Sequence, residues 1–202
     1  MVENSHEDAP HEGDLASVAR IRQAALRLFA TQGVSSTPLR AIAAEARVTV
    51  GLIPHHFGSK NGLRDGLERW IVAQFADALA QANAAAGEQG ANAQERQAHV
   101  NAMLEQNPFI KDYMRREFLH PHPGGTLLKQ LTELIADSVD DMRARGFASS
   151  SRDRTDQVVA AMVRQLGTLF LQPMVDQVID VLPPSQKPFS TPELVVEMRR
   201  ND

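Results

Sequence analysis

Cysteine is absent from this chain of 202 residues. Its absence excludes a disulfide framework, a thiolate nucleophile and any zinc or iron–sulfur site with cysteine ligands. Apolar runs are only a handful of residues long, so the sequence predicts no transmembrane helix. The acidic and polar residues 1–14 are unlike a secretory signal peptide. We therefore expect a protein of the reducing cytoplasm with no membrane partner.

Aromatic residues are also scarce, at 5% of the chain. Alanine, leucine, glutamine, arginine and glutamate are abundant instead, and this mixture favours helices over sheets. Valine and isoleucine rarely alternate with polar residues over the length of a strand. The sequence predicts an all-α fold.

The net charge of −4 is unevenly distributed along the chain. Residues 1–14 carry five acids and no base, and we expect them to form a disordered acidic arm. Residues 15–63 carry six bases against Glu45 alone, whereas residues 64–202 are net negative. A basic block inside an acidic protein indicates a polyanionic partner, and the alternative is a solvated basic helix face.

Three short helices are predicted before residue 58. Apolar residues recur at helical spacing over residues 15–32, and Gly33 is placed to end this first helix. Thr37 followed by Pro38 predicts the start of a second helix with Thr37 as its N-cap. Thr49 is the expected N-cap of a third helix two or three residues after the second. This arrangement is typical of a helix–turn–helix.

Two stretches in this region resemble the DNA-binding domain of the TetR (tetracycline repressor) family. They are TPLRAIA, residues 37–43, and VTVGLIPHHFGSK, residues 48–60. The usual family pattern is Thr-Thr-x-Arg-x-Ile-Ala, then Val-Ser-x-Gly-x-Leu-Tyr-x-Tyr-Phe-x-Ser-Lys. The similarity covers residues 18–70 in both spacing and identity, whereas residues 71–202 match only in length and helical character.

The resemblance implies two domains and three partners. Residues 15–62 would form the helix–turn–helix DNA-binding domain, and residues 63–202 a larger helical domain that dimerises and binds an effector. The partners would be double-stranded DNA with a palindromic operator, a second copy of the chain and a small-molecule effector. The expected function is transcriptional regulation, most simply repression relieved by the effector, with no enzymatic activity and no cofactor.

The resemblance also implies which residues face the DNA. Arg40 would reach the major groove, where arginine commonly pairs with guanine. Lys60 lies in the first turn of a helix, where a cation opposes the helix dipole, so an external phosphate would explain it. The full predicted set is Ser36, Thr37, Arg40, Thr49, Val50, Gly51, Leu52, Pro54, His55, His56 and Lys60.

The sequence departs from the family pattern at three positions. Arg47 stands where glycine is frequent, and a left-handed backbone there would be mildly strained. Val50 replaces a frequent polar residue. Pro54 replaces the usual tyrosine; with Thr49 as N-cap it would lie at the fifth helical position and remove a hydrogen bond to the Val50 carbonyl, so the helix would bend or tighten locally.

The effector is expected to lie between the long helix that follows Lys60 and the helices over about 92–170. Many of the apolar residues there are phenylalanine and methionine, which predict an adaptable pocket for a mostly hydrophobic or aromatic molecule. Tyr113, Gln74 and His99 are the few polar groups expected to orient it. The predicted walls are Phe75, Met103, Phe109, Tyr113, Met114, Phe118, Met162, Leu166 and Phe170.

By resemblance, dimerisation would use helices at about 151–182, where Ala160, Ala161 and Gly167 are small enough for close helix approach. Two other functions stay open: an all-helical small-molecule-binding protein or enzyme whose first helices are only structural, and an architectural DNA-binding protein without effector. No catalytic constellation stands out from residue spacing. The adjacent His55 and His56 are poorly spaced to chelate a metal, so we expect no metal site.

Overall fold

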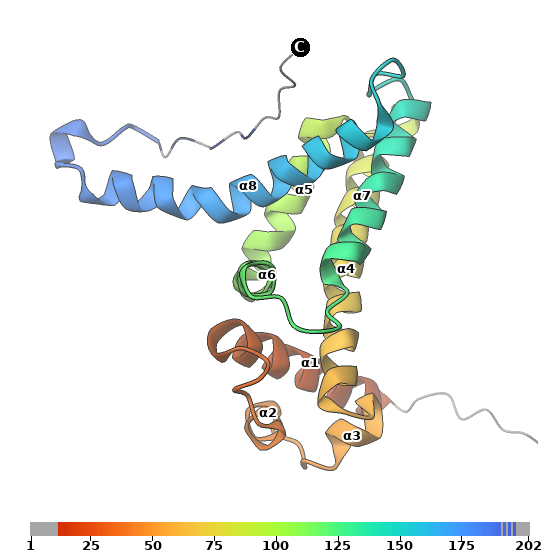
Figure 1. Cartoon of the computed structure of the whole chain (residues 1–202), viewed down its shortest axis with the longest axis vertical. Coiled ribbons are helices and arrows are strands. Elements are labelled where there is room, and N and C mark those ends of the chain that lie inside the picture. The colour runs from red at the N-terminus through yellow and green to blue at the C-terminus, as the bar shows by residue number, and fades with distance from the viewer. Residues whose placement is uncertain (1–11, 191, 193, 195, 197–202) are drawn as a thin grey trace, which may run out of the picture.

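The computed structural model describes residues 12–190 together with residues 192, 194 and 196. Within this part of the chain every regular element is a helix, which confirms the all-α prediction (Figure 1). The first three helices gather at one end of the molecule, and the later helices form the body at the other end. Residues 1–11 of the predicted acidic arm lie outside the described part.

The first three helices form a small head whose buried apolar residues belong to the core cluster that continues into the body. These helices are α1 (Glu12–Gln32), α2 (Leu39–Ala46) and α3 (Leu52–Phe57). Ile21 and Phe29 of α1, Ile42 of α2 and Ile53 of α3 are fully buried against one another. Because α1 begins at Glu12, the expected boundary of the arm at residue 14 is too late by about one helical turn. Burial of these side chains is what holds the six-residue α3 in place, since so short a helix is unstable alone.

Helix α4 (Lys60–Ala85) connects the head to the body (Figure 1). Ser59 caps it, because the Ser59 Oγ accepts a hydrogen bond from the Gly62 amide at 3.0 Å. Its first turns pack on the head and its later turns pack on α5 and α7. The predicted domain boundary at residue 62 therefore falls inside one continuous helix.

The body consists of α5 (Ala93–Gln106), α6 (Pro108–Leu119), α7 (Leu127–Ala144) and α8 (Arg154–Val181), with short 3₁₀ turns at Gly87–Gln89 and Pro184–Gln186. In Figure 1, α7 runs alongside α4 and α8 crosses the top of the body, with its second half extending beyond the other helices. Helix α6 contacts both α1 and α8.

Helix α8 continues through Pro173 without ending. A proline removes the hydrogen bond to the carbonyl four residues earlier, which here is that of Leu169. Arg115 of α6 donates from Nε to this carbonyl at 2.9 Å. The missing intrahelical bond is thus replaced by a bond from a neighbouring helix.

Helix α8 is also the one described helix that is long and apolar enough, by length and composition, to cross a membrane. The expectation of no transmembrane helix rested on uninterrupted apolar runs, whereas α8 meets this length and composition test on the average over a window. The 18-residue window of α8 that passes this test has a mean hydropathy of 1.3, and only 17% of the window is buried within the chain. Its exposed apolar side chains therefore need an explanation.

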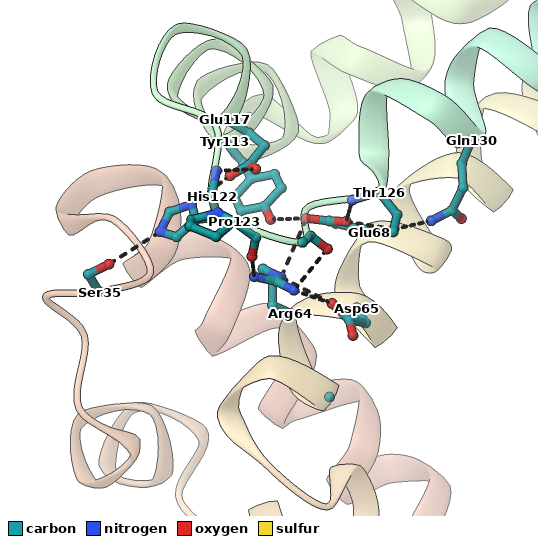
Figure 2. A network of polar contacts seen from close by, with 12 residues as sticks. Ser35, Arg64, Asp65, Glu68, Tyr113, Glu117, His122, Pro123, Thr126 and Gln130 are labelled. Atoms are coloured by element: carbon teal, nitrogen blue, oxygen red, sulfur yellow. Dashed lines mark hydrogen bonds and ion pairs between the residues drawn. The ribbon is translucent and has the colours of Figure 1, made fainter.

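A buried carboxylate, that of Glu68, connects three parts of the chain (Figure 2). Glu68 is fully buried on α4 and accepts hydrogen bonds from the Tyr113 hydroxyl at 3.1 Å and from the Thr126 amide and hydroxyl at 2.9 and 3.0 Å. The Arg64 Nε lies 3.8 Å from it. Burial, and after it the Glu68 charge, raise the pKa of Tyr113 far above its usual range, so its hydroxyl stays protonated as the donor.

The loop between α6 and α7 is bound to the head as well as to Glu68. His122 donates its amide to Glu117 at 3.0 Å, and its Nδ1 lies 2.9 Å from the same carboxylate. Its Nε2 lies 3.4 Å from the Ser35 hydroxyl in the loop that precedes α2 (Figure 2). Arg116 of α6 donates to the carbonyls of Ala30 and Thr31 at the end of α1. Gly33 leaves room for this arginine, since a Cβ there would lie 3.1 Å from its Nη1.

We expect Glu68→Ala to lower the free energy of unfolding by about 3–5 kcal/mol, because it removes the shared acceptor of the buried Tyr113 hydroxyl and of the Thr126 amide and hydroxyl. The matched control is Glu133→Ala on α7, whose carboxylate is 61% exposed and 3.8 Å from Lys129. This change should cost less than about 0.5 kcal/mol. Urea unfolding measures both, and equal losses would show that the Glu68 network does not stabilise the fold.

Candidate nucleic-acid interface and ligand cavity

The predicted DNA-facing residues of α2 and α3 are largely solvent-exposed. Arg40 on α2 is exposed and has no hydrogen-bond or ion-pair partner among the described residues. Ser36, Gly51, Pro54 and His55 are exposed too. The remaining exposed or half-buried members of the predicted set are Thr49, Val50, Leu52, His56 and Lys60.

Thr37 is the exception, and its predicted roles are wrong. Its side chain is fully buried, and its hydroxyl donates to the Gly33 carbonyl at 2.8 Å instead of capping α2. The residue at the N-cap position is Pro38, without a side-chain hydrogen bond. A buried hydroxyl cannot reach a phosphate, so Thr37 closes the turn between α1 and α2.

The third helix begins later than the sequence predicts. It starts at Leu52 with Gly51 at the N-cap position, and Thr49 contributes only its carbonyl, which accepts from the Leu52 amide at 3.1 Å. Pro54 is therefore the third helical residue, not the fifth. The Val50 carbonyl, expected to lose its partner, accepts from the Ile53 amide at 3.2 Å. Proline is tolerated in a first helical turn, and the bonds of Leu52 to Thr49 and of Ile53 to Val50 each span three residues, as in a locally tightened turn.

The expectation for Arg47 is confirmed. It is the one described non-glycine residue with a positive φ, at φ 54° and ψ 49°, and it ends α2 in the left-handed conformation. Its amide and that of Val48 bond back to the last turn of α2. This tight turn sets the angle between α2 and α3.

The two adjacent histidines of α3 differ in environment. His55 is exposed, whereas His56 is half-buried, and its Nε2 is buried without a hydrogen-bond partner among the described residues. The His56 ring contacts the edges of His55 and Phe57. Within the described ranges, no group of three histidine, aspartate or glutamate side chains is placed to hold a metal ion.

Only part of the basic block is available to a partner. Arg20 donates to the Ala46 carbonyl, Arg27 pairs with Glu45 at 2.8 Å, and Arg22 stacks over the Trp70 ring at 4.9 Å. Lys60 donates from Nζ to the Ser35 carbonyl at 3.2 Å, which occupies one of its three donors. Partial burial lowers the pKa of Lys60. Arg40 on α2 and Arg47 at the end of α2 are the arginines exposed here.

A cavity of about 340 Å³ lies between α4, α5, α7 and α8. This volume lies in the range of about 300–1,000 Å³ that small-molecule sites occupy. Four of the nine predicted wall residues line it: Phe75, Met114, Met162 and Leu166.

The other five predicted wall residues lie outside this cavity, and their assignment to it is wrong. Tyr113 is buried and hydrogen-bonded to Glu68, Phe118 packs toward Phe170 with ring centroids 6.2 Å apart, and Phe109 lies under the Arg27 guanidinium. Met103 also packs against the main core. Gln74 and His99, the expected polar groups, do not line the cavity either. The prediction drew four of its nine walls from α6, of which Met114 alone lines the cavity, and none from α7, which supplies much of the lining.

The residues that sequence reasoning missed come chiefly from α7 and the loop after it. The apolar ones include Leu131, Leu134, Ile135, Val139 and Met142. Their helical period was visible in the sequence, but nothing there distinguishes a cavity wall from a core face. Three arginines also line the cavity, namely Arg96, Arg152 and Arg164.

Residues 21–67 match the family model described as bacterial regulatory proteins, tetR family. The chain is 32% identical over 138 residues to the HTH-type transcriptional regulatory protein RaaS of Mycobacterium tuberculosis, a match that covers 68% of this chain and 60% of RaaS. One similar solved structure is described as the molecular basis for control of antibiotic production by bacterial hormones. It has a TM-score of 0.56 and 19% identity, and the match covers 80% of this chain and 86% of that one. Another is the multidrug binding protein EbrR complexed with imidazole, with a TM-score of 0.50 and 20% identity, and 92% of each chain covered.

We expect Pro54→Ala to change the free energy of unfolding by less than about 1 kcal/mol, because this proline lies in a first turn and costs no hydrogen bond. A proline in a helix interior would behave differently, since its removal would stabilise the protein by about 3 kcal/mol. Pro108→Ala, at the first position of α6, is the matched control and should have a similarly small effect. Thermal and urea unfolding distinguish the two outcomes.

Proposed function

Because the chain belongs to the TetR family of bacterial regulatory proteins, we propose that it is a sequence-specific DNA-binding transcriptional regulator whose operator complex is released by a small molecule. The observation that carries the proposal is the exposed face of α2 and α3, where Arg40 has no internal partner among the described residues. A buried core holds this face rigidly, so its side chains are presented in fixed register. Selection of bound sequences from random DNA is the direct test, and recovery of no preferred sequence would contradict the proposal.

The DNA-contacting set that we propose is the predicted one without Thr37. Arg40 reads a base, and Lys60 and Ser36 contact phosphate from the adjoining turns. The exposed His55 lies next to the backbone of the duplex. Thr49, Val50, Gly51, Leu52, Pro54 and His56 form the rest of the α3 contact surface.

The second partner in this proposal is another copy of the chain. Past Pro173, α8 exposes an apolar stripe at helical spacing, whose members Met174, Val178 and Val181 are 57–82% exposed. Gln172, Asp176 and Asp180 follow one another on the opposite side, so this half of α8 is two-sided. A membrane span would be apolar all round, whereas a two-sided helix fits a partner helix.

The small residues expected at the dimer contact are already used within the chain. Ala160 and Ala161 line the cavity, and a Cβ on Gly167 would lie 2.6 Å from the Val196 side chain. The proposed contact is therefore the stripe after Pro173. Two identical heads related by a two-fold axis require a palindromic operator.

The effector in this proposal occupies the cavity described above, because α4 forms one of its walls and also begins at the head. A ligand shifts an equilibrium only if it prefers one of the two states. Here it would prefer the arrangement of α4 that sets the wrong spacing of the two heads for DNA. Such a protein acts in the cytoplasm and catalyses no reaction.

We expect Arg40→Ala to weaken operator binding by about 1–3 kcal/mol and to relax one position of the selected sequence. Lys60→Ala serves as the contrast: it should weaken binding to all sequences alike and lower the slope of affinity against salt by about one. Quantitative DNA-binding titrations at several salt concentrations measure both effects. An unchanged selected sequence for Arg40→Ala would remove this residue from base reading.

We expect Met174→Glu to convert a dimer into a monomer, raising the dimer dissociation constant at least about a hundredfold, because an unpaired charge would be buried in the contact. Asp180→Asn changes the charge by the same amount on the opposite side of α8 and should leave the dimer intact. Light scattering at micromolar concentration reports both. A monomeric parent protein would contradict the proposed contact.

A further inference from the structure

The cavity between α4, α5, α7 and α8 combines an apolar interior with positive charge. Its deep end is formed by buried apolar side chains, among them Val100, Met114 and Leu131, which are at most 4% exposed. The described lining contains three arginines and no aspartate or glutamate. The charged side chains of the described lining are therefore all positive. A purely hydrophobic ligand would make no ionic contact with them.

Arg96 is the buried arginine of the three, and its donors are already engaged. It donates to the Ala91 carbonyl at 2.9 Å, to the Ser138 hydroxyl at 2.8 Å and to the Asp141 carboxylate. Hydrogen bonds from Arg145 and Arg96 hold the pKa of Asp141 below its usual value, so Asp141 stays charged and neutralises Arg96. Arg96 therefore connects α5 to α7 and leaves little for a ligand.

Arg152 and Arg164 differ from Arg96 in their exposure to solvent and in their lack of hydrogen-bond partners within the described part of the chain. Both are exposed while lining the cavity, which places their side chains at its solvent edge. Neither guanidinium has a hydrogen-bond or ion-pair partner among the described residues. The nearest acid before α8, Asp153, is engaged as the N-cap, since it accepts from the Asp156 amide at 3.1 Å. Two guanidinium groups are thus free at the edge of an apolar cavity.

We infer that the cavity selects an amphipathic monoanion, of which a medium-chain carboxylate is the simplest example. Its apolar chain enters the deep end between Phe75, Met114 and Leu131, and its carboxylate lies at the edge within reach of Arg152 and Arg164. Guanidinium groups match a carboxylate well, because two N–H donors fit its two oxygens. This inference rests on the proposed function, for which it specifies the chemical class of effector.

The charge of the lining disfavours two other classes of ligand. An organic cation would meet like charge without a carboxylate to balance it. A neutral apolar molecule would fill the deep end but leave both arginines unused. The edge and the deep end together therefore favour an anion with one long apolar part.

Calorimetric titration of the full chain in the absence of DNA tests the inference with three probes of equal chain length: decanoate, decan-1-ol and decyltrimethylammonium. We expect decanoate to bind at least about tenfold more tightly than either other probe. Arg152→Gln and Arg164→Gln should each weaken decanoate binding about fivefold and leave decan-1-ol binding unchanged. Both side chains are exposed, so these variants keep the fold.

Two further variants locate the effect. Lys129→Gln removes one positive charge from an exposed position on α7 outside the cavity and should change no affinity. Ala161→Phe fills the cavity and should abolish binding of decanoate. Equal affinity for the three probes, preference for the cation, no binding of decanoate, or arginine variants that bind decanoate like the parent would each overturn the inference.

The result is independent of the DNA-binding proposal, because the titration contains no DNA. A chain that selects a palindromic sequence but does not discriminate decanoate overturns the ligand class alone. A chain that prefers decanoate but selects no DNA sequence overturns the regulatory function and supports the ligand class.

Discussion

The buried carboxylate of Glu68 is the interaction on which the relation of head and body depends. A charge removed from water is tolerated only when every oxygen is compensated, and here the donors come from α6, from the start of α7 and from α4 itself. These groups are far apart in sequence, so no local propensity brings them together. The same loop that supplies Thr126 also carries His122 to the Ser35 hydroxyl of the head. This polar network thus supplements the apolar cluster that runs from the first three helices into the body and holds the head against it.

Arginine has a consistent structural role in this body. Arg115 donates to the carbonyl that Pro173 leaves free, Arg116 donates to the last carbonyls of α1, and Arg96 joins α5 to α7. Each of these side chains replaces a hydrogen bond that the backbone cannot make alone, or joins two helices through several donors. Other arginines are exposed and have no side-chain hydrogen bond or ion pair among the described residues, and three of them lie at the two surfaces where a ligand is proposed: Arg40 on the head, and Arg152 and Arg164 at the cavity.

The helical class and the head were predictable from the sequence because they rest on local signals. Helical period and Gly33 as a stop follow from neighbouring residues, whereas the left-handed Arg47 was indicated by the glycine of the family pattern. Thr37 shows the limit of such signals, since threonine before proline suits an N-cap and the fold buries its hydroxyl instead. The cavity was only partly predictable: Tyr113 satisfies a distant carboxylate, and no pattern within α6 reveals that Glu68 lies opposite. Partners separated by tens of residues decide which aromatic side chains line a cavity and which fill the core.

The position of the cavity relative to Glu68 constrains how a ligand can act on the head. Phe75 and Leu79 line the cavity on α4, and Phe75 lies about two helical turns beyond Glu68 on the same helix. A ligand that displaces α4 there must either break the bonds of Glu68 or move its partners with it. Breaking them exposes a buried charge to an uncompensated environment, which costs several kcal/mol, more than the roughly 1–3 kcal/mol of a typical allosteric coupling. The second route is therefore favoured: α4 and the loop from His122 to Thr126 move together, and the head follows as a rigid unit through Ser35 and Lys60.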